Sequence, residues 1–367
     1  MTTITTPPTN KPSAPITNTL TTGILPKYVP WLLLVLSWAI VGSVFVVLMA
    51  AGVDENFNVV GTVFFGTVLF VLVQYLVSRS YEGRRPATNR FVTSLVTLAF
   101  IIALLPLISL LYTTISNGLP RFDLTFLTNS MRNVVGEGGG ALHALVGTLE
   151  ITGMAALISV PVGLLTAIYL VEYGRGHLAR AITFLVDVMT GIPSIVAGLF
   201  AFAFFALILN QPGIRFGFGG SVALSVLMIP VVVRSSEEML KLVPNELREA
   251  SYALGVPKWL TIVKVVLPTS VAGITTGVVL AISRVIGETA PLLIIAGFTQ
   301  SMNYDLFKER MMTLPVFVYT QYANQGNPAE AYVERAWAGA LLLVVIVMVL
   351  NLIARIVAKV FSPKLGR

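Results

Sequence analysis

Long apolar segments constrain this chain more than any other feature of its sequence. A helix needs about 20 mostly apolar residues to cross a bilayer. Eight segments of this kind occur, at 29–50, 58–78, 91–112, 143–170, 181–209, 218–236, 268–297 and 337–359. Only 11% of the 367 residues are charged, whereas a soluble domain has about 25%. Such a chain cannot cover a surface that faces water, so we predict an all-α, polytopic transmembrane protein.

The remaining parts of the chain suggest how it is organised. Residues 1–28 are rich in Thr, Pro and Asn and lack the apolar core of a signal peptide, which predicts a disordered tail. Residues 29–78 are expected to form a peripheral transmembrane hairpin around the turn Asp54-Glu55-Asn56. Residues 85–360 form the main transmembrane domain in this interpretation, and residues 361–367 form a short C-terminal tail.

The distribution of basic residues predicts the orientation in the membrane. If all eight segments span and the N-terminus is cytoplasmic, 17 of the 24 Lys and Arg residues fall on cytoplasmic stretches and 6 on outer loops. This asymmetry places both termini in the cytoplasm. It also explains the net charge of +7 without nucleic acid, so we expect membrane lipid as a partner and no nucleic acid.

Several kinds of chemistry have no support in the sequence. The chain has no cysteine and only two histidines, His143 and His177, so neither a disulfide, a thiolate site nor a histidine metal cluster is expected. A membrane-embedded enzyme is not indicated, because the sequence shows neither a nucleophile paired with a base nor carboxylates at the spacing of metal ligands. A phosphate-binding loop of the Gly-x-x-x-x-Gly-Lys-Ser/Thr type is also missing, so any ATP hydrolysis must come from a partner. A membrane scaffold or sensor, which moves no substrate, requires none of this chemistry and is a further alternative to an enzyme.

The loop between the sixth and seventh segments carries the most specific motif. It reads Glu249-Ala250-Ser251, then Gly255 after three residues, and Val265-Val266-Leu267-Pro268 after nine more. The small side chains suit a helix that fits into a cleft on another protein. Gly255 permits the turn that ends this helix, and Pro257 favours a new start. We predict a short helix over about 245–254 in a cytoplasmic loop that extends to 268, with an ordinary amphipathic connector as the alternative.

The seventh segment contains two charges within the membrane. Residues 269–298 would form a helix of about 45 Å, and Arg284 lies near its midpoint, where a charge costs at least ~2.5–3.5 kcal/mol. Glu288 follows four residues later, so we expect the two to neutralise each other on one helix face. Pro291 cannot donate a hydrogen bond to Gly287, so the helix should bend or open near 287–291. A substrate anion or a purely structural salt bridge would each account for the arginine.

The fifth segment contains a run of residues that weaken a helix, Thr190-Gly191-Ile192-Pro193-Ser194-Ile195-Val196-Ala197-Gly198. Gly191 and Pro193 weaken the helix there, and Thr190 and Ser194 offer hydroxyl groups. Close helix packing is the alternative interpretation. Two further embedded acids, Asp187 and Glu150, are open candidates either to pair with Arg284 or to cap their own helix surroundings.

The cytoplasmic motif resembles the EAA loop of ABC importer permeases, E-A-A-x3-G-x9-I-x-L-P. Ser251 stands for the second Ala, and Val265 stands for the Ile. Together with residues 191–196 and 284–293, it makes the chain similar to the PstA-type permeases of bacterial phosphate ABC importers. The resemblance covers about 90–360, and the first two apolar segments lie outside it.

This resemblance implies a type I importer in the bacterial plasma membrane. The extracytoplasmic protein PstS delivers phosphate, a sister permease PstC completes the pore, and a PstB dimer hydrolyses ATP with Mg. The chain itself would bind no cofactor. Four residues would couple it to the ATPase: Glu249, Ala250, Ser251 and Gly255. Four others, Arg284, Glu288, Thr190 and Ser194, would lie on the substrate pathway. A permease for another oxyanion or a phosphonate is the alternative.

Overall fold

The computed structural model describes residues 25–52 and 56–361. These residues form helices and irregular segments with no strand among them, so the predicted all-α fold is confirmed. The parts of the tails before residue 25 and after residue 361 lie outside this description, as do Asp54 and Glu55 of the predicted turn. The chain divides into two compact units, residues up to Leu110 and residues from Leu111 onward.

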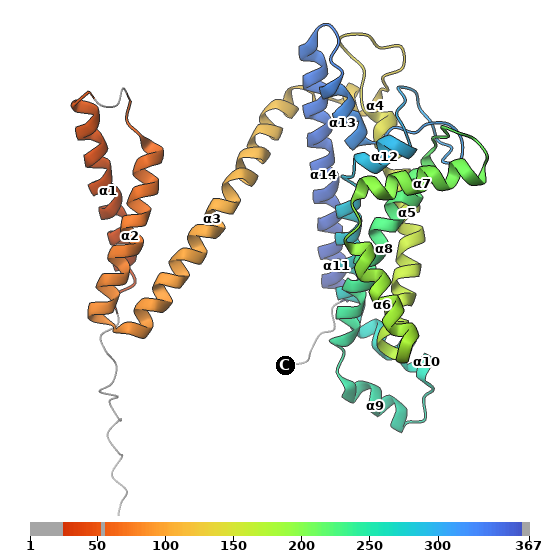
Figure 1. Cartoon of the computed structure of the whole chain (residues 1–367), viewed down its shortest axis with the longest axis horizontal. Helices are drawn as coiled ribbons and strands as arrows, with labels where there is room; N and C mark the ends of the chain where they lie inside the picture. The colour runs from red at the N-terminus through yellow and green to blue at the C-terminus, as the bar shows by residue number, and fades with distance from the viewer. Residues whose placement is uncertain (1–24, 53–55, 362–367) are drawn as a thin grey trace, which may run out of the picture. The chain divides into compact units, whose positions relative to one another are not determined.

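The first unit contains α1 (Val29–Ala50), α2 (Val59–Tyr81) and most of α3 (Arg84–Gly118) (Figure 1). Gly66 allows α1 and α2 to approach closely, because a Cβ at this position would lie 2.5 Å from Cδ1 of Trp38. Small residues at such crossings are typical of helices packed in a membrane. The peripheral position expected for residues 29–78 stays a prediction.

Glu82 joins the helices of the first unit at the turn between α2 and α3. Its carboxylate accepts hydrogen bonds from Arg90 Nε and Nη2 at 2.7 and 2.8 Å, from Ser78 Oγ at 2.6 Å and from the Leu25 amide at 2.8 Å. Burial of the carboxylate raises its pKa, but the hydrogen bonds from Arg90, Ser78 and Leu25 outweigh this effect and lower the pKa to about 2. Glu82 therefore stays ionised at neutral pH and stabilises this turn.

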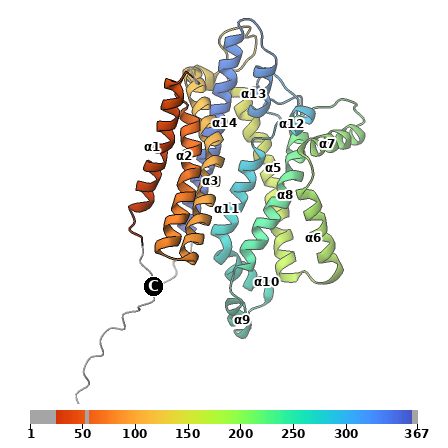
Figure 2. The same ribbon diagram turned by 60° about the vertical axis from the view of Figure 1, so that its left-hand side comes forward.

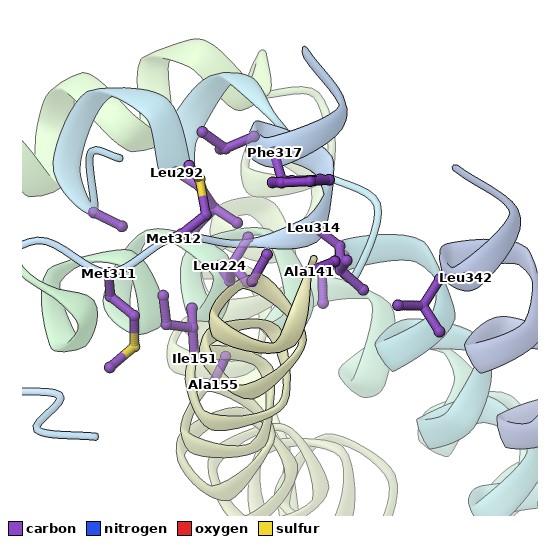
Figure 3. Close-up of a cluster of buried hydrophobic side chains, with 14 of the residues drawn as sticks. Ala141, Ile151, Ala155, Leu224, Leu292, Met311, Met312, Leu314, Phe317 and Leu342 are labelled. Atoms are coloured by element: carbon purple, nitrogen blue, oxygen red, sulfur yellow. The ribbon is translucent and has the colours of Figure 1, made fainter. Parts of the chain in front are cut away.

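The second unit holds the remaining helices, which surround one main core. They are η1 (Leu119–Arg121), α4 (Leu124–Thr128), α5 (Leu142–Ile168), the π-helical η2 (Tyr169–Tyr173), α6 (Gly176–Thr190), α7 (Ser194–Ile208), α8 (Gly217–Lys241), α9 (Asn245–Ala253), α10 (Lys258–Thr261), the π-helical η3 (Ile262–Val266), α11 (Leu267–Val285), α12 (Ala290–Ile295), α13 (Leu314–Ala323) and α14 (Ala329–Phe361). Figure 3 shows the core, where Ile151 of α5, Leu224 of α8, Leu292 of α12 and Phe317 of α13 meet.

The membrane-spanning helices follow the apolar segments, but two of these segments are interrupted, 181–209 and 268–297. Among the described residues, seven helices are long and apolar enough to cross a membrane. The segment 181–209, predicted as one span, contains two helices, α6 and α7, bent by 108° at a short break, and it is an eighth span if the pair is counted together. Pro193 lacks an amide hydrogen, and its ring disfavours helical backbone at the residue before it, so the helix cannot continue through it. Figures 1 and 2 both show α7 lying across the end of α6.

The loop at 119–141 is fastened to the helices by a buried arginine. Arg335 of α14 is 1% exposed and donates to the carbonyls of Gly136 and Gly138 at 2.6 and 3.1 Å. It also donates to Gln321 of α13 at 2.9 Å. The glycine-rich part of the loop is therefore packed against its own unit.

Candidate functional site

The candidate site is built around a break between α11 and α12. Helix α11 ends at Val285, and α12 begins at Ala290 with Pro291 in its first turn. The helix thus opens in the region where Pro291 predicts it. Irregular backbone at membrane depth is tolerated where it is buried in protein or lines a cavity. Arg284 lies in the last turn of α11, directly before this break.

Arg284 and Glu288 do not form the predicted pair. Among the described residues, Arg284 has neither an ion pair nor a hydrogen bond through its side chain, and it is exposed on the surface of its unit. Residues four apart share a face only while the helix continues. Because α11 ends at Val285, Glu288 leaves that face, and its amide bonds to the Val285 carbonyl at 3.1 Å. The arginine therefore stays available to another group.

The second break lies between α6 and α7. Thr190 is the last residue of α6, and its hydroxyl donates to the Val186 carbonyl at 2.9 Å. Ser194 is the first residue of α7 and is partly exposed. Between them, Gly191 and Pro193 are exposed. The Thr190 hydroxyl is thus engaged within its own helix, and Ser194 lies at the start of the next one.

Helices α7 and α12, which follow the two breaks, pack directly together. Gly198 of α7 lies against the backbone of Pro291 in α12. Helix α8 also packs closely against α12, where Gly220 meets Leu292 and Gly219 meets Ile295. Close packing, the alternative interpretation of the 190–198 run, therefore applies to Gly198. The same packing connects the break that follows Thr190 with the break that follows Arg284.

An ion network lies beside the first break and involves Asp187. Asp187 of α6 pairs with Arg234 of α8, so it is not the partner of Arg284. Arg234 also pairs with Glu237 at 2.7 Å, and Glu237 pairs with Lys241 at 2.7 Å. Sequence reasoning missed this network, since 47 residues separate Asp187 from Arg234. The one sequence feature that indicated such a network is the presence of Arg234 and Glu237 close together at the end of an apolar segment.

Glu150 of α5 lies elsewhere in the second unit and does not pair with Arg284 either. Its Oε2 is buried without a hydrogen-bond partner, and the residue lines an open depression together with residues 302–307. Among the described residues, no group of acids and histidines is arranged to hold a metal ion.

The predicted cytoplasmic helix is α9, which lies beyond the ends of α8 and α10 (Figures 1 and 2). Gly255 has a positive φ of 78°. Its amide bonds to the Tyr252 carbonyl at 2.9 Å, and the Val256 amide bonds to the Ser251 carbonyl at 3.2 Å. These are the two bonds of a Schellman cap. Gly255 thus ends α9 as its sequence position indicates.

The four predicted coupling residues of this helix do not share one surface. Glu249, Ala250 and Gly255 are exposed, but Ser251 is only 6% exposed. The Ser251 hydroxyl shares a hydrogen bond of 2.8 Å with that of Thr261 in α10. Ser251 therefore fastens α9 to the next helix, and its side chain faces inward rather than toward a partner.

The described helices, the break beside an unpaired arginine and the exposed helix beyond the spans define a multi-pass subunit of a membrane transport system. Residues 159–367 match the family described as binding-protein-dependent transport system inner membrane component. The chain is 46% identical over 290 residues to the phosphate transport system permease protein PstA 1 of Mycobacterium tuberculosis (strain CDC 1551 / Oshkosh), covering 78% of this chain and 93% of that protein. It is 40% identical over 280 residues to the PstA protein of Pasteurella multocida (strain Pm70), covering 76% and 97%. The chain belongs to the PstA family of ABC importer permeases.

A solved structure shows the same fold. It is a bacterial ABC transporter involved in the import of the acidic polysaccharide alginate, and it covers 76% of this chain and 99% of its own. The TM-score is 0.52 and the sequence identity is 16%. This similarity concerns the fold alone.

Proposed function

We propose that this chain is one transmembrane subunit of an ATP-driven importer of inorganic phosphate. The observation that carries the proposal is the unpaired Arg284 beside a helix break, in a chain whose relatives are named phosphate transport permeases. A guanidinium fork matches two phosphate oxygens. A single arginine, rather than a cage of them, also lets the site release what it binds.

The proposal assigns a function to each exposed part of the site. A sister permease of the PstC type covers the face that carries Arg284 and completes the pathway, with Glu288, Thr190 and Ser194 near the breaks. An ATPase dimer of the PstB type docks on α9 and supplies ATP hydrolysis with Mg. Exposed apolar side chains on and beside this helix, Leu247, Tyr252 and Leu254, support such docking.

A binding protein of the PstS type delivers phosphate at the end of the unit opposite α9. This chain hydrolyses no ATP and holds no cofactor in the proposed mechanism. Its place is the bacterial plasma membrane, with both termini in the cytoplasm, as the basic residues predict.

The test is purification of the chain from its native membrane, identification of the subunits that accompany it, and reconstitution into liposomes. We expect ATP-dependent uptake of radioactive phosphate that excess sulfate or phosphonate does not suppress. Uptake that follows sulfate or a phosphonate instead would refute phosphate as the substrate. Purification without an ATPase would refute the proposed assembly.

A further inference from the structure

A buried ion pair ties the coupling helix α9 to the end of α5. Arg248 of α9 donates to Oε1 of Glu172 through Nε at 3.0 Å, and its Nη2 lies 2.9 Å from the same oxygen as part of the ion pair. The two side chains are 12% and 5% exposed. Glu172 lies in η2, the π-helical turn that continues α5. The pair joins residues that are 76 positions apart.

Arg248 also fastens the end of α8. Its Nη2 donates to the Leu240 carbonyl at 2.9 Å, and its Nη1 donates to the Val243 carbonyl at 2.5 Å. Leu240 lies in the last turn of α8, and Val243 lies two residues beyond its end, where helical partners run out. One guanidinium therefore holds three segments together: η2, the end of α8 and α9.

Lys258, the first residue of α10, makes a second contact with η2. Its Nζ donates to the backbone carbonyl of Glu172 and lies 4.8 Å from the centre of the Tyr173 ring. The side chain of Glu172 thus pairs with Arg248, and its backbone carbonyl accepts a hydrogen bond from Lys258. These two cationic residues lie at different ends of the same loop.

The covalent path of the chain explains why these contacts matter. Helix α9 continues directly from α8 and into α10, η3 and α11, so any displacement of α9 reaches those helices along the backbone. Helix α5 has no such connection to α9. Among the described residues, Arg248 and Lys258 supply the polar side-chain bonds that hold η2 to this loop. A bulge of the π type often marks a functional position within a helix.

We infer that Glu172 is a positioning residue for energy coupling, which transmits a displacement of α9 to α5. This inference rests on the proposed function, because it takes α9 as the docking site of an ATPase. Without the Glu172 carboxylate, α9 would still move α8 and α11, while α5 would lag behind. ATP would then be hydrolysed with less transport for each molecule consumed.

The test uses the complete importer in liposomes and measures phosphate taken up per ATP hydrolysed. For Glu172→Gln we expect this ratio to fall about fivefold or more, the lower range of typical coupling between sites. We expect unchanged subunit stoichiometry in the same preparation. Glu172→Asp keeps the charge and should restore much of the ratio. The matched control is Glu238→Gln, since Glu238 is exposed on α8 and has no ion pair among the described residues.

A second measurement monitors the contact between η2 and α9 directly and does not depend on transport. The chain has no cysteine, so spin labels at Leu165→Cys and Glu246→Cys report the distance between α5 and α9 alone. We expect Glu172→Gln to broaden this distance distribution. An unchanged distribution, an unchanged ratio, or a loss of subunit association that Glu172→Asp shares would each overturn the inference. A wild-type complex that moves no phosphate would refute the proposed function instead, while the distances between the spin labels would still test the contact between η2 and α9.

Discussion

Gly198 of α7 lies so close to Pro291 of α12 that a Cβ at position 198 would be 2.5 Å from the Pro291 Cα. The obstructing atom belongs to the backbone, so a side-chain rotation cannot relieve the clash. Each residue lies in a helix that directly follows a break, one at Gly191–Pro193 and one at residues 286–289. This contact therefore holds the two interrupted segments against each other.

Replacing Gly198 should separate α7 from α12. We expect Gly198→Ala to lower the stability of the subunit by about 1–3 kcal/mol, the usual cost of overpacking, and to reduce phosphate uptake by the importer. Thermal unfolding and uptake measured on the same preparation check this. Gly153→Ala is the matched control, because no atom lies within 4 Å of the Cβ it would introduce. Equal effects of the two substitutions would contradict the importance of the contact.

The C-terminal cap of α9 predicts that substitutions of Gly255 differ in their effect according to how well the new residue tolerates a positive φ. Its φ of 78° costs a side chain about 1–2 kcal/mol, but Asn tolerates this conformation better than most residues. We expect Gly255→Val to reduce phosphate-stimulated ATP hydrolysis or ATPase association, and Gly255→Asn to retain most of both. No atom lies within 4 Å of an added Cβ, so the difference reports backbone conformation. Similar behaviour of Val and Asn would argue against this explanation.

The lowered pKa of Glu82 predicts how the stability of the first unit depends on pH. The pKa falls from 4.5 to about 2 on folding, so the unfolded chain binds more protons between these values. The carboxylate thus contributes on the order of 3 kcal/mol above about pH 4.5. This contribution is lost as the pH falls toward 2.

The variant Glu82→Gln tests this dependence. We expect it to unfold at a clearly lower temperature than the wild type near pH 7, and the difference should shrink near pH 3. Glu238→Gln, an exposed substitution, should show a small difference at both pH values. A constant deficit for Glu82→Gln across this range would show that the charge does not stabilise the turn.

Local signals predicted the parts of this structure that depend on short stretches of sequence. Hydropathy located the spans, and the glycine at position 255 located the end of α9. The angle at Pro193 could not be read in the same way, because a proline ends a helix without fixing the direction of the next one. Hydropathy therefore predicts a single segment at 181–209 without the sharp angle inside it.

Long-range pairing accounts for most of what the sequence did not reveal. The ion pair of Asp187 with Arg234 depends on how α6 packs against α8, which no local pattern encodes. The predicted pair of Arg284 and Glu288 failed for a different reason: the four-residue rule assumed a helix that in fact ends between them. Pro291 pointed to that break, so the two expectations were in conflict.

Arg284 gives the sharpest prediction, since it has no partner among the described residues. If it meets the anion, Arg284→Gln should nearly abolish phosphate uptake while the complex still assembles. Because Arg284 forms no ion pair with any residue of the described part of the second unit, its removal leaves no acid there unpaired, and assembly should survive. Uptake and the yield of complete complex are measured side by side.

The variants at Glu288 separate a pathway arginine from a structural salt bridge. If the two charges tied helices together in the complex, each single change would leave one buried charge alone and harm assembly. The double variant, Arg284→Gln with Glu288→Gln, would then recover both assembly and uptake. We expect instead that Glu288→Gln differs from Arg284→Gln, and that the double variant assembles but takes up almost no phosphate. Full uptake by the double variant would show that Arg284 is not required in the pathway.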